Sequence, residues 1–82
     1  MHKCPCCGCY TFQAPVDCAI AYICPVCCWE NDVFIKSDDE PSDENGGITL
    51  NQAKANYKTF AASRRKLIPL TRKPTLEELK NY

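Results

Sequence analysis

The residues best suited to chemistry in this chain are its eight cysteines, all of which lie between residues 4 and 28. Two tetrapeptides, Cys4-Pro5-Cys6-Cys7 and Cys24-Pro25-Val26-Cys27, share the order Cys-Pro-x-Cys, and sixteen residues separate them. A C-x2-C pair lets one tight turn aim two sulfurs at a single point, and proline presets the backbone of such a turn. Two pairs at this spacing are typical of a tetrahedral zinc site. We therefore predict one structural Zn²⁺ held by the outer cysteines of the two tetrapeptides, which are Cys4, Cys7, Cys24 and Cys27.

Other uses of these cysteines stay open from the sequence alone. Four thiolates also suit iron, although nothing in the chain points to electron transfer. Paired cysteines also form disulfides, but the first residues, Met1 to Pro5, contain no apolar run of the kind that directs secretion. We therefore expect a cytoplasmic location, where thiols stay reduced and bind metals. His2 is the only histidine, and we expect it to be an exposed terminal residue rather than a ligand.

Four cysteines fall outside the predicted ligand set, namely Cys6, Cys9, Cys18 and Cys28. Cys6 and Cys9 form a C-x2-C pair of their own, so the first pair has an alternative register, and a two-metal cluster of all eight is conceivable. We prefer Cys4 and Cys7 because they reproduce the order Cys-Pro-x-Cys-Gly and mirror Cys24 and Cys27. Gly8 also tolerates the positive φ often needed after the second ligand. We expect the surplus cysteines to be small buried hydrophobes or surface thiols, because a reactive thiol requires a lowered pKa.

The elements that position these cysteines must be small, because the chain has only 82 residues. A domain of this size gains little stability from its apolar core and needs a further stabilising element, such as a bound metal. Three short β-prone runs, over residues 10–13, 19–23 and 29–35, lie within the cysteine-rich part. We predict one small α+β domain, in which zinc-ribbon or rubredoxin-like knuckles lie on a short antiparallel sheet. An amphipathic helix and a short C-terminal helix follow.

The C-terminal part of the chain supplies these helices. Thr49 and Gln52 form a capping box for a helix whose apolar residues recur at helical spacing. Thr75 and Glu78 open a second, shorter helix in the same way. Pro69 favours an extended path between the two helices. The predicted segments are the cysteine-rich part (1–36), an acidic loop (37–48), a helix (49–63), a basic extended arm (64–74) and a short helix (75–82).

The charges of the chain balance overall but are segregated. Ten basic and ten acidic residues give a formal net charge of zero, which argues against a strongly nucleic-acid-seeking domain. An acidic loop and a basic arm are features that steer a specific partner, although they would also fit a solvated connection or two segments that face each other. The residues that we predict to bind a partner are Asp38, Asp39, Glu40, Asp43, Glu44, Arg64, Arg65 and Lys66.

Catalysis and membrane insertion find little support in the sequence. Four cysteine ligands would leave no open position on a zinc ion, and no Cys-His-carboxylate arrangement is evident. No apolar run approaches the ~20 residues of a membrane span. We therefore expect neither an enzyme, nor a small-molecule substrate, nor a membrane protein.

A family resemblance emerges from these motifs. Cys4-Pro5-Cys6-Cys7-Gly8, Tyr22 to Cys27 and Trp29-Glu30 resemble the cysteine-rich CPCC family, and the likeness continues through Gly46-Gly47 and the following helix, over roughly residues 4–62. The resemblance implies a small bacterial, zinc-ribbon-like protein from a family mostly without assigned function. Some similar proteins beside secreted toxins are regarded as immunity factors. The chain departs from the family pattern at Cys9, at Cys28 and in the short link at Ile48.

These observations predict a non-catalytic zinc-binding protein that acts as a protein-interaction module. An immunity-like or regulatory partner of a bacterial toxin, or of another protein, is the leading specific expectation. The alternative is a nucleic-acid-binding zinc ribbon that uses the basic arm. A rubredoxin-like iron protein or a thiol redox protein ranks below both.

Overall fold

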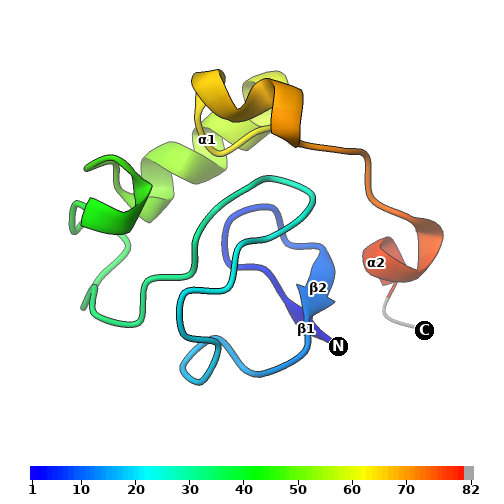
Figure 1. The fold of residues 1–82 in the computed structure, drawn as a ribbon, viewed down its shortest axis with the longest axis horizontal. Coiled ribbons are helices and arrows are strands. Elements are labelled where there is room, and N and C mark those ends of the chain that lie inside the picture. Colours follow the sequence, from blue (N-terminus) through cyan, green and yellow to red (C-terminus); the bar gives the residue numbers. More distant parts are fainter. Residues whose placement is uncertain (81–82) are drawn as a thin grey trace.

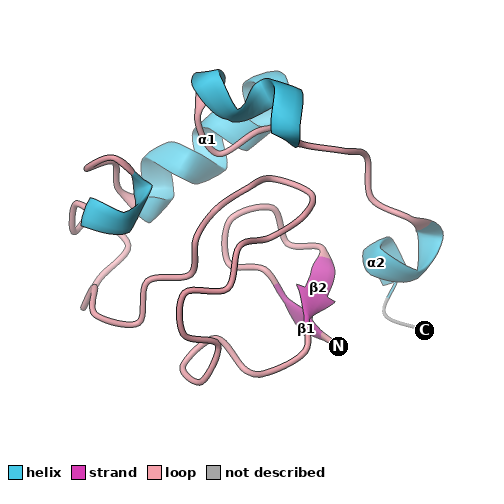
Figure 2. Ribbon diagram, viewed as in Figure 1, coloured by secondary structure: helices cyan, strands magenta, loops and turns pink. Residues whose placement is uncertain are grey.

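The computed structural model describes residues 1–80, and most of that chain is turns and loops around a small sheet (Figures 1 and 2). Two strands, β1 (His2–Lys3) and β2 (Tyr10–Phe12), pair antiparallel. Two α-helices follow, α1 (Leu50–Phe60) and α2 (Leu76–Lys80). Two 3-10 helices, η1 (Asp43–Asn45) and η2 (Arg65–Leu70), complete the elements. The result is the predicted small α+β fold with a short antiparallel sheet.

The sheet positions the first cysteine pair. His2 pairs with Phe12 and Lys3 pairs with Tyr10, with an irregular register between them, so that residues 4–9 form a loop closed by the two strands. The β-prone run over residues 10–13 is therefore a strand, as expected. Phe12 is fully buried, which anchors this hairpin in the core.

The other two β-prone runs do not form strands. Ile23 and Glu30 make only an isolated bridge, and Asn31 donates its backbone N–H to Tyr22 O at 2.8 Å. Ala21 has a positive φ of 56°, which interrupts extended backbone just before this pairing begins. In place of the strands expected over 19–23 and 29–35, the structure has one isolated bridge between the residues that precede and follow the second cysteine pair.

Residues 37–48, expected to be a plain loop, contain a small folded unit. Ser42 and Ile48 form a bridge, and η1 lies between them. Ser42 and Asn45 are almost completely buried. Asn45 pairs with the backbone of Glu30, accepting from its N–H at 2.9 Å and donating to its carbonyl oxygen at 2.8 Å. The Asn45 side chain thus makes the two hydrogen bonds to the Glu30 backbone that a neighbouring strand would make in a sheet.

Helix α1 begins as predicted and ends earlier than expected. Thr49 and Gln52 form the predicted capping box. The helix ends at Phe60 rather than at residue 63, because Ala61 adopts a left-handed backbone with φ of 62°. This turn brings Ser63 against the second cysteine pair, where its N–H donates to Cys27 O at 2.9 Å. Because α1 ends early, the residues that follow it contact the second knuckle.

The basic arm is not extended throughout. Arg65–Leu70 form the 3-10 helix η2, which includes Pro69, and only the residues that follow run without regular structure. The fixed φ of proline, near −65°, fits a 3-10 helix as well as an extended chain. Helix α2 begins after Thr75 as expected and contacts β2. The expected end of this helix at residues 81–82 lies outside the described residues.

The core lies between α1 and the two cysteine loops. Trp29, Phe12 and Val26 are its largest buried apolar side chains, and Leu50 and Ala53 of α1 pack with the cysteines. None of the helices within residues 1–80 has the length and apolar character needed to cross a membrane.

Candidate metal centre

Each cysteine pair sits in a knuckle, and the two knuckles have the same backbone hydrogen bonds. In the first knuckle, Gly8 N–H donates to Cys4 O at 2.9 Å and Cys4 N–H donates to Cys9 O at 2.8 Å. In the second knuckle, Cys28 N–H donates to Cys24 O at 2.8 Å and Cys24 N–H donates to Trp29 O at 3.0 Å. The repeated Cys-Pro-x-Cys sequence therefore specifies a repeated local structure, and each knuckle presents two sulfurs on one side.

The four predicted ligands meet between the knuckles. Their Sγ atoms all lie within 4.8 Å of one another. The Sγ atoms of Cys4 and Cys27 are 3.7 Å apart, and those of Cys7 and Cys24 are also 3.7 Å apart. A tetrahedral ion with metal–sulfur bonds of ~2.3 Å requires sulfurs about 3.8 Å apart. The donor set and its spacing therefore fit a tetrahedral metal ion.

The sulfurs are not bridged to one another. All eight cysteines are free thiols. A disulfide would bring two sulfurs to about 2.05 Å, far closer than the 3.7 Å observed between the knuckles. The expectation of a reduced cluster is confirmed. Four thiolates in tetrahedral geometry suit either zinc or iron.

The thiols of the cluster hydrogen-bond to one another, and these hydrogen bonds shift their pKa values. Hydrogen bonds from Cys27, Cys4 and Cys7 lower the pKa of Cys24 below its ordinary value. Hydrogen bonding to Cys24 is the main cause that raises the pKa of each of the other three thiols, and burial adds to it. Because four thiolates at this separation repel one another, holding all of them ionised requires a shared cation.

Two groups outside the cluster hydrogen-bond to its sulfurs. The Thr11 hydroxyl on β2 lies 3.2 Å from Cys24 Sγ. The Trp29 N–H donates to Cys27 Sγ at 3.5 Å. Donors of this kind orient metal ligands and stabilise their charge. The sequence analysis did not identify Thr11, because only pairing of β1 with β2 brings it to the second knuckle.

Comparison with known protein families gives one match. A family model described as cysteine-rich CPCC matches residues 2–78. The chain belongs to the cysteine-rich CPCC family. The search of curated proteins returned no match, and neither did the search of solved structures. The resemblance inferred from the motifs is thus confirmed, and it extends past α1 into α2.

The four remaining cysteines of this CPCC protein lie outside the cluster. Cys6 and Cys9 are buried, which is consistent with the expectation of small hydrophobes. Cys18 is exposed. Cys28 is half-buried, and its thiol donates to Leu70 O at 3.4 Å. Neither Cys6 nor Cys9 joins the metal-binding set, so the structure adopts the preferred register of the first pair.

Cys28 also has a structural role that the sequence analysis missed. It occupies the position in the second knuckle that Gly8 occupies in the first, and both residues have positive φ, 66° and 78° respectively. The signal was present in the sequence, because each is the residue directly after a Cys-Pro-x-Cys unit. Comparing the two units position by position would have found it.

The acidic residues predicted to bind a partner are partly engaged within this CPCC chain. Asp38 pairs with Lys54 at 3.4 Å, and Asp39 accepts from the side chain of Asn51 at 2.8 Å. Glu40 accepts from the N–H of Lys36 at 2.9 Å. Asp43 and Glu44 are exposed on η1. The start of the acidic loop is thus tied to α1, while the two acidic residues of η1 are exposed.

The basic residues contact different parts of the chain. The Arg64 guanidinium packs so closely on Gly46 that a Cβ there would collide with it. The Arg65 guanidinium lies 4.9 Å from the centre of the Phe60 ring. Lys66 is exposed. The acidic loop and the basic arm therefore meet at Gly46 and Arg64.

Proposed function

We propose that this CPCC protein is a non-catalytic zinc protein whose fold depends on the metal and whose surface binds another protein. The observation that carries the metal assignment is the set of four sulfurs, with 3.7 Å between Cys4 and Cys27 and between Cys7 and Cys24. A zinc ion bound there would link the two knuckles and stabilise the fold. Structural zinc contributes ~10–16 kcal/mol in small peptides at neutral pH, more than a core of this size supplies.

The closed ligand set supports a structural rather than a catalytic metal. A catalytic zinc keeps one position for water or substrate, whereas four cysteine thiolates fill the tetrahedron. Zinc is favoured over iron because nothing near the cluster points to electron transfer. We also propose a cytoplasmic location, where the cysteines would stay reduced.

The metal assignment is tested by elemental analysis of the purified protein. We expect about one equivalent of zinc, and little iron, in the parent protein. Cys4→Ser and Cys27→Ser should each lose most of the bound metal, because three thiolates hold zinc less tightly than four. Cys18→Ser is the matched control, since Cys18 is exposed and lies outside the cluster, and it should keep its metal. Full metal retention in both ligand variants, or iron in the parent, would contradict the assignment.

The proposed partner is a protein, with an immunity-like or regulatory role toward a bacterial toxin as the leading specific case. Its support is the segregation of charge, with exposed carboxylates on η1 and an acidic stretch before it. Purification of the tagged chain from its native host, followed by mass spectrometry, tests this role. A stoichiometric protein partner that withstands moderate salt is expected. Recovery of the chain alone under native conditions would contradict it.

Nucleic-acid binding through the basic arm is the second candidate. Exposed Lys66 and Lys73 favour it. Against it, Arg72 is held by Glu78 in a two-pronged ion pair, with contacts of 2.7 and 2.8 Å. Titration with DNA and RNA at two salt concentrations distinguishes the candidates, because phosphate contacts give affinity that falls steeply with salt. Salt-dependent nucleic-acid binding in the micromolar range would favour this alternative.

A further inference from the structure

The four predicted metal ligands differ in how completely the chain covers them. Cys4, Cys24 and Cys27 are buried, with exposed fractions of 1%, 0% and 0%. Cys7 is the only one of the four that is partly exposed. Its sulfur nevertheless belongs to the cluster, since it lies 3.7 Å from Cys24 Sγ. The fold therefore shields three ligands from solvent more completely than the fourth.

The exposure of Cys7 follows from an asymmetry between the two knuckles. The chain after α1 runs along the second knuckle, where Ser63 N–H donates to Cys27 O at 2.9 Å. The first knuckle lacks this cover, because within residues 1–80 no backbone N–H donates to Cys7 O. The next residue, Gly8, is exposed. The two knuckles thus share a backbone structure, but only the second has a segment lying over it.

Hydrogen bonds to the sulfurs follow the same division. Cys24 Sγ lies 3.2 Å from the Thr11 hydroxyl, and Cys27 Sγ accepts from Trp29 N–H at 3.5 Å. Such bonds stabilise a thiolate and make it less nucleophilic. Among residues 1–80, Cys7 Sγ hydrogen-bonds only to sulfurs of the cluster itself. Cys7 is therefore both the most accessible ligand and one that no outside donor stabilises.

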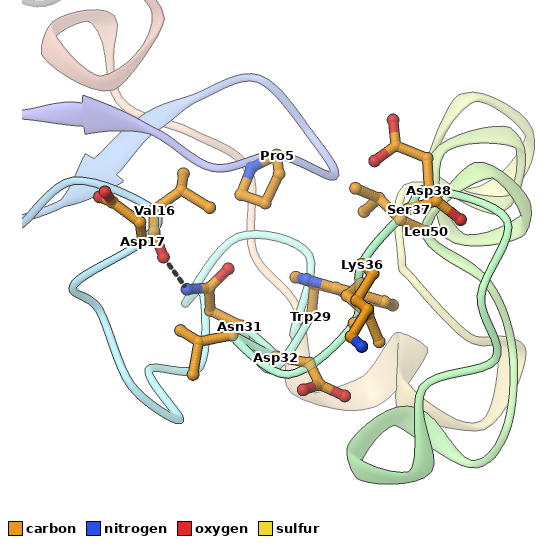
Figure 3. Close-up of a pocket in the computed structure, with 12 residues that line it drawn as sticks. Pro5, Val16, Asp17, Trp29, Asn31, Asp32, Lys36, Ser37, Asp38 and Leu50 are labelled. Atoms are coloured by element: carbon orange, nitrogen blue, oxygen red, sulfur yellow. Dashed lines mark hydrogen bonds between the residues drawn. The ribbon is translucent and has the colours of Figure 1, made fainter.

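The hollow beside the second knuckle gives no other route to the sulfurs. It has a volume of about 460 Å³, and the residues that line it include Pro5, Trp29 and Leu50 (Figure 3). None of the four ligands lines it. Within residues 1–80, solvent therefore reaches the cluster at Cys7.

We propose that Cys7 is the reactive ligand of the metal site, at which soft carbon electrophiles such as α,β-unsaturated carbonyl compounds attach covalently. The proposal rests on the proposed metal binding, because a bound cation holds all four sulfurs as thiolates, so that access decides which one reacts. The Cys7 sulfur forms a C–S bond with the β-carbon of the electrophile while the C=C π bond breaks, and the α-carbon then takes a proton from water. Cys7 is left as a neutral thioether, which is a weaker metal ligand than a thiolate.

Tyr57 on α1 borders the open side of the site. It is partly buried and packs against the core that contains the cysteines. Burial, followed by the charges of Cys9 and Cys7, raises the pKa of its phenol, and its side chain hydrogen-bonds to Cys9. The Tyr57 ring therefore limits access to Cys7 from the side of α1.

The first test is limited labelling of the full-length, zinc-loaded protein with N-ethylmaleimide. Cys18→Ser is the background, because exposed Cys18 would otherwise consume the reagent. Tandem mass spectrometry of proteolytic fragments identifies the labelled cysteines, while a zinc-sensitive dye follows release of the metal. We expect Cys7 to react at least about tenfold faster than the three buried ligands, since each of those must wait for a local opening of the fold. Zinc release should follow the labelling of Cys7 in time.

Two results of this comparison among the four ligands would overturn the proposal. Labelling of a buried ligand before Cys7 would place the reactive position elsewhere in the cluster. Equal rates at all four ligands would show that the site reacts only when the whole fold opens.

Three variants test whether access controls the rate. Tyr57→Ala should speed the labelling of Cys7 about three- to tenfold, whereas Tyr57→Phe, which keeps the ring, should change it less than about twofold. Leu50→Ala is the control for general loosening, because it shortens a buried side chain at the start of the same helix. It should not favour Cys7 over the other ligands. Equal acceleration by Tyr57→Ala and Leu50→Ala would overturn the role of Tyr57 as a cover.

The outcomes also separate this proposal from the proposed metal binding. Zinc that stays bound after Cys7 is fully labelled would show that Cys7 is not a ligand, and would contradict the metal assignment itself. A zinc-loaded protein whose four ligands react at one rate would keep the metal assignment and remove only the reactive ligand.

Discussion

Cys28 carries a side chain at a backbone conformation that favours glycine. Its φ of 66° matches the 78° of Gly8 at the equivalent position of the other knuckle. A left-handed backbone costs residues other than glycine about 1–2 kcal/mol, because Cβ crowds the following carbonyl oxygen. The thiol recovers part of this cost through its hydrogen bond to Leu70 O. The surplus thiol of the second knuckle therefore marks a strained position next to a proposed ligand.

Replacing Cys28 with glycine should therefore stabilise the protein. We expect Cys28→Gly to raise the free energy of unfolding by up to about 1 kcal/mol, since relief of backbone strain outweighs the added freedom of the unfolded chain. Gly8→Ala should lower it by about 1 kcal/mol, and because nothing lies within 4 Å of the added Cβ, the effect isolates the backbone. Denaturant unfolding at a fixed zinc concentration measures both. Destabilisation by Cys28→Gly would show that the bond to Leu70 outweighs the strain.

At the scale of elements, the acidic loop supports the second knuckle through buried polar contacts. Asn45 bonds to both backbone groups of Glu30 and donates to the Ser42 hydroxyl at 2.8 Å. The Ser42 hydroxyl in turn donates to Asp32. A satisfied buried network of this kind holds one arrangement, because removing any member leaves the others without partners.

Asn45→Ala should therefore destabilise the fold strongly. We expect the free energy of unfolding to fall by about 2–4 kcal/mol, because the partly buried N–H and carbonyl of Glu30 lose their hydrogen-bond partner. Asn51→Ala is the matched control, since Asn51 is exposed and, among residues 1–80, its side chain bonds only to Asp39 at the surface. Its effect should stay within about 0.5 kcal/mol. Thermal and denaturant unfolding of the metal-loaded variants compare the two, and equal effects would contradict a supporting role for the network.

Helix α2 depends on a surface ion pair and a helix cap. The Arg72 guanidinium, by hydrogen bonding, holds the pKa of Glu78 well below its usual range, at about 2. A lowered folded-state pKa means that the carboxylate stabilises the helix above the unfolded pKa, and that this contribution is lost as pH falls through about 2. At neutral pH the contribution is fully present, although exposure of Arg72 keeps it below about 1 kcal/mol.

Glu78→Gln should accordingly loosen α2 at neutral pH while leaving the knuckles unchanged. We expect faster amide hydrogen exchange over Leu76–Lys80, by up to about fivefold, which corresponds to a loss below about 1 kcal/mol. Glu77→Gln is the control, because Glu77 is exposed and is not part of the pair with Arg72. The difference between the two variants should shrink below pH 4, where the parent carboxylate begins to lose its advantage. No difference at pH 7 would show that packing on β2 alone holds the helix.

The sequence predicted those elements whose cause is local. The Cys-Pro-x-Cys units specify their own turns, and Thr49 with Gln52 specifies the start of α1, so both were recognised. The burial of Ser42 and Asn45 depends on Asp32 and Glu30, which lie ten and fifteen residues away, and no local pattern signals it. The end of α1 is likewise set by a distant contact, between Ser63 and Cys27. Pro69 fits either an extended chain or a 3-10 helix, so its residue type did not decide between them.

At the scale of the whole molecule, little regular structure holds the chain together. The strands have two and three residues, and the described chain spans 32 × 27 × 16 Å. An isolated two-stranded hairpin is marginal in water, and a helix of 11 residues does not form stably alone. Leu50 and Ala53 of α1 pack on the buried cysteines of both knuckles. The four sulfurs that could hold a metal lie where the two knuckles meet, beneath the helix that packs on the same core.

Removing the metal should consequently unfold the knuckles and α1 together. We expect a strong zinc chelator to abolish the helical circular-dichroism signal and the spread of NMR amide shifts, because α1 loses the surface on which it packs. Returning zinc under reducing conditions should restore both signals, which separates metal loss from oxidation of the eight thiols. Cys18→Ser should behave like the parent in this cycle, since Cys18 is exposed. If the metal-free protein kept its α1 signal and its melting temperature, the apolar core and the Asn45 network would suffice for folding, and the metal would act on function rather than on structure.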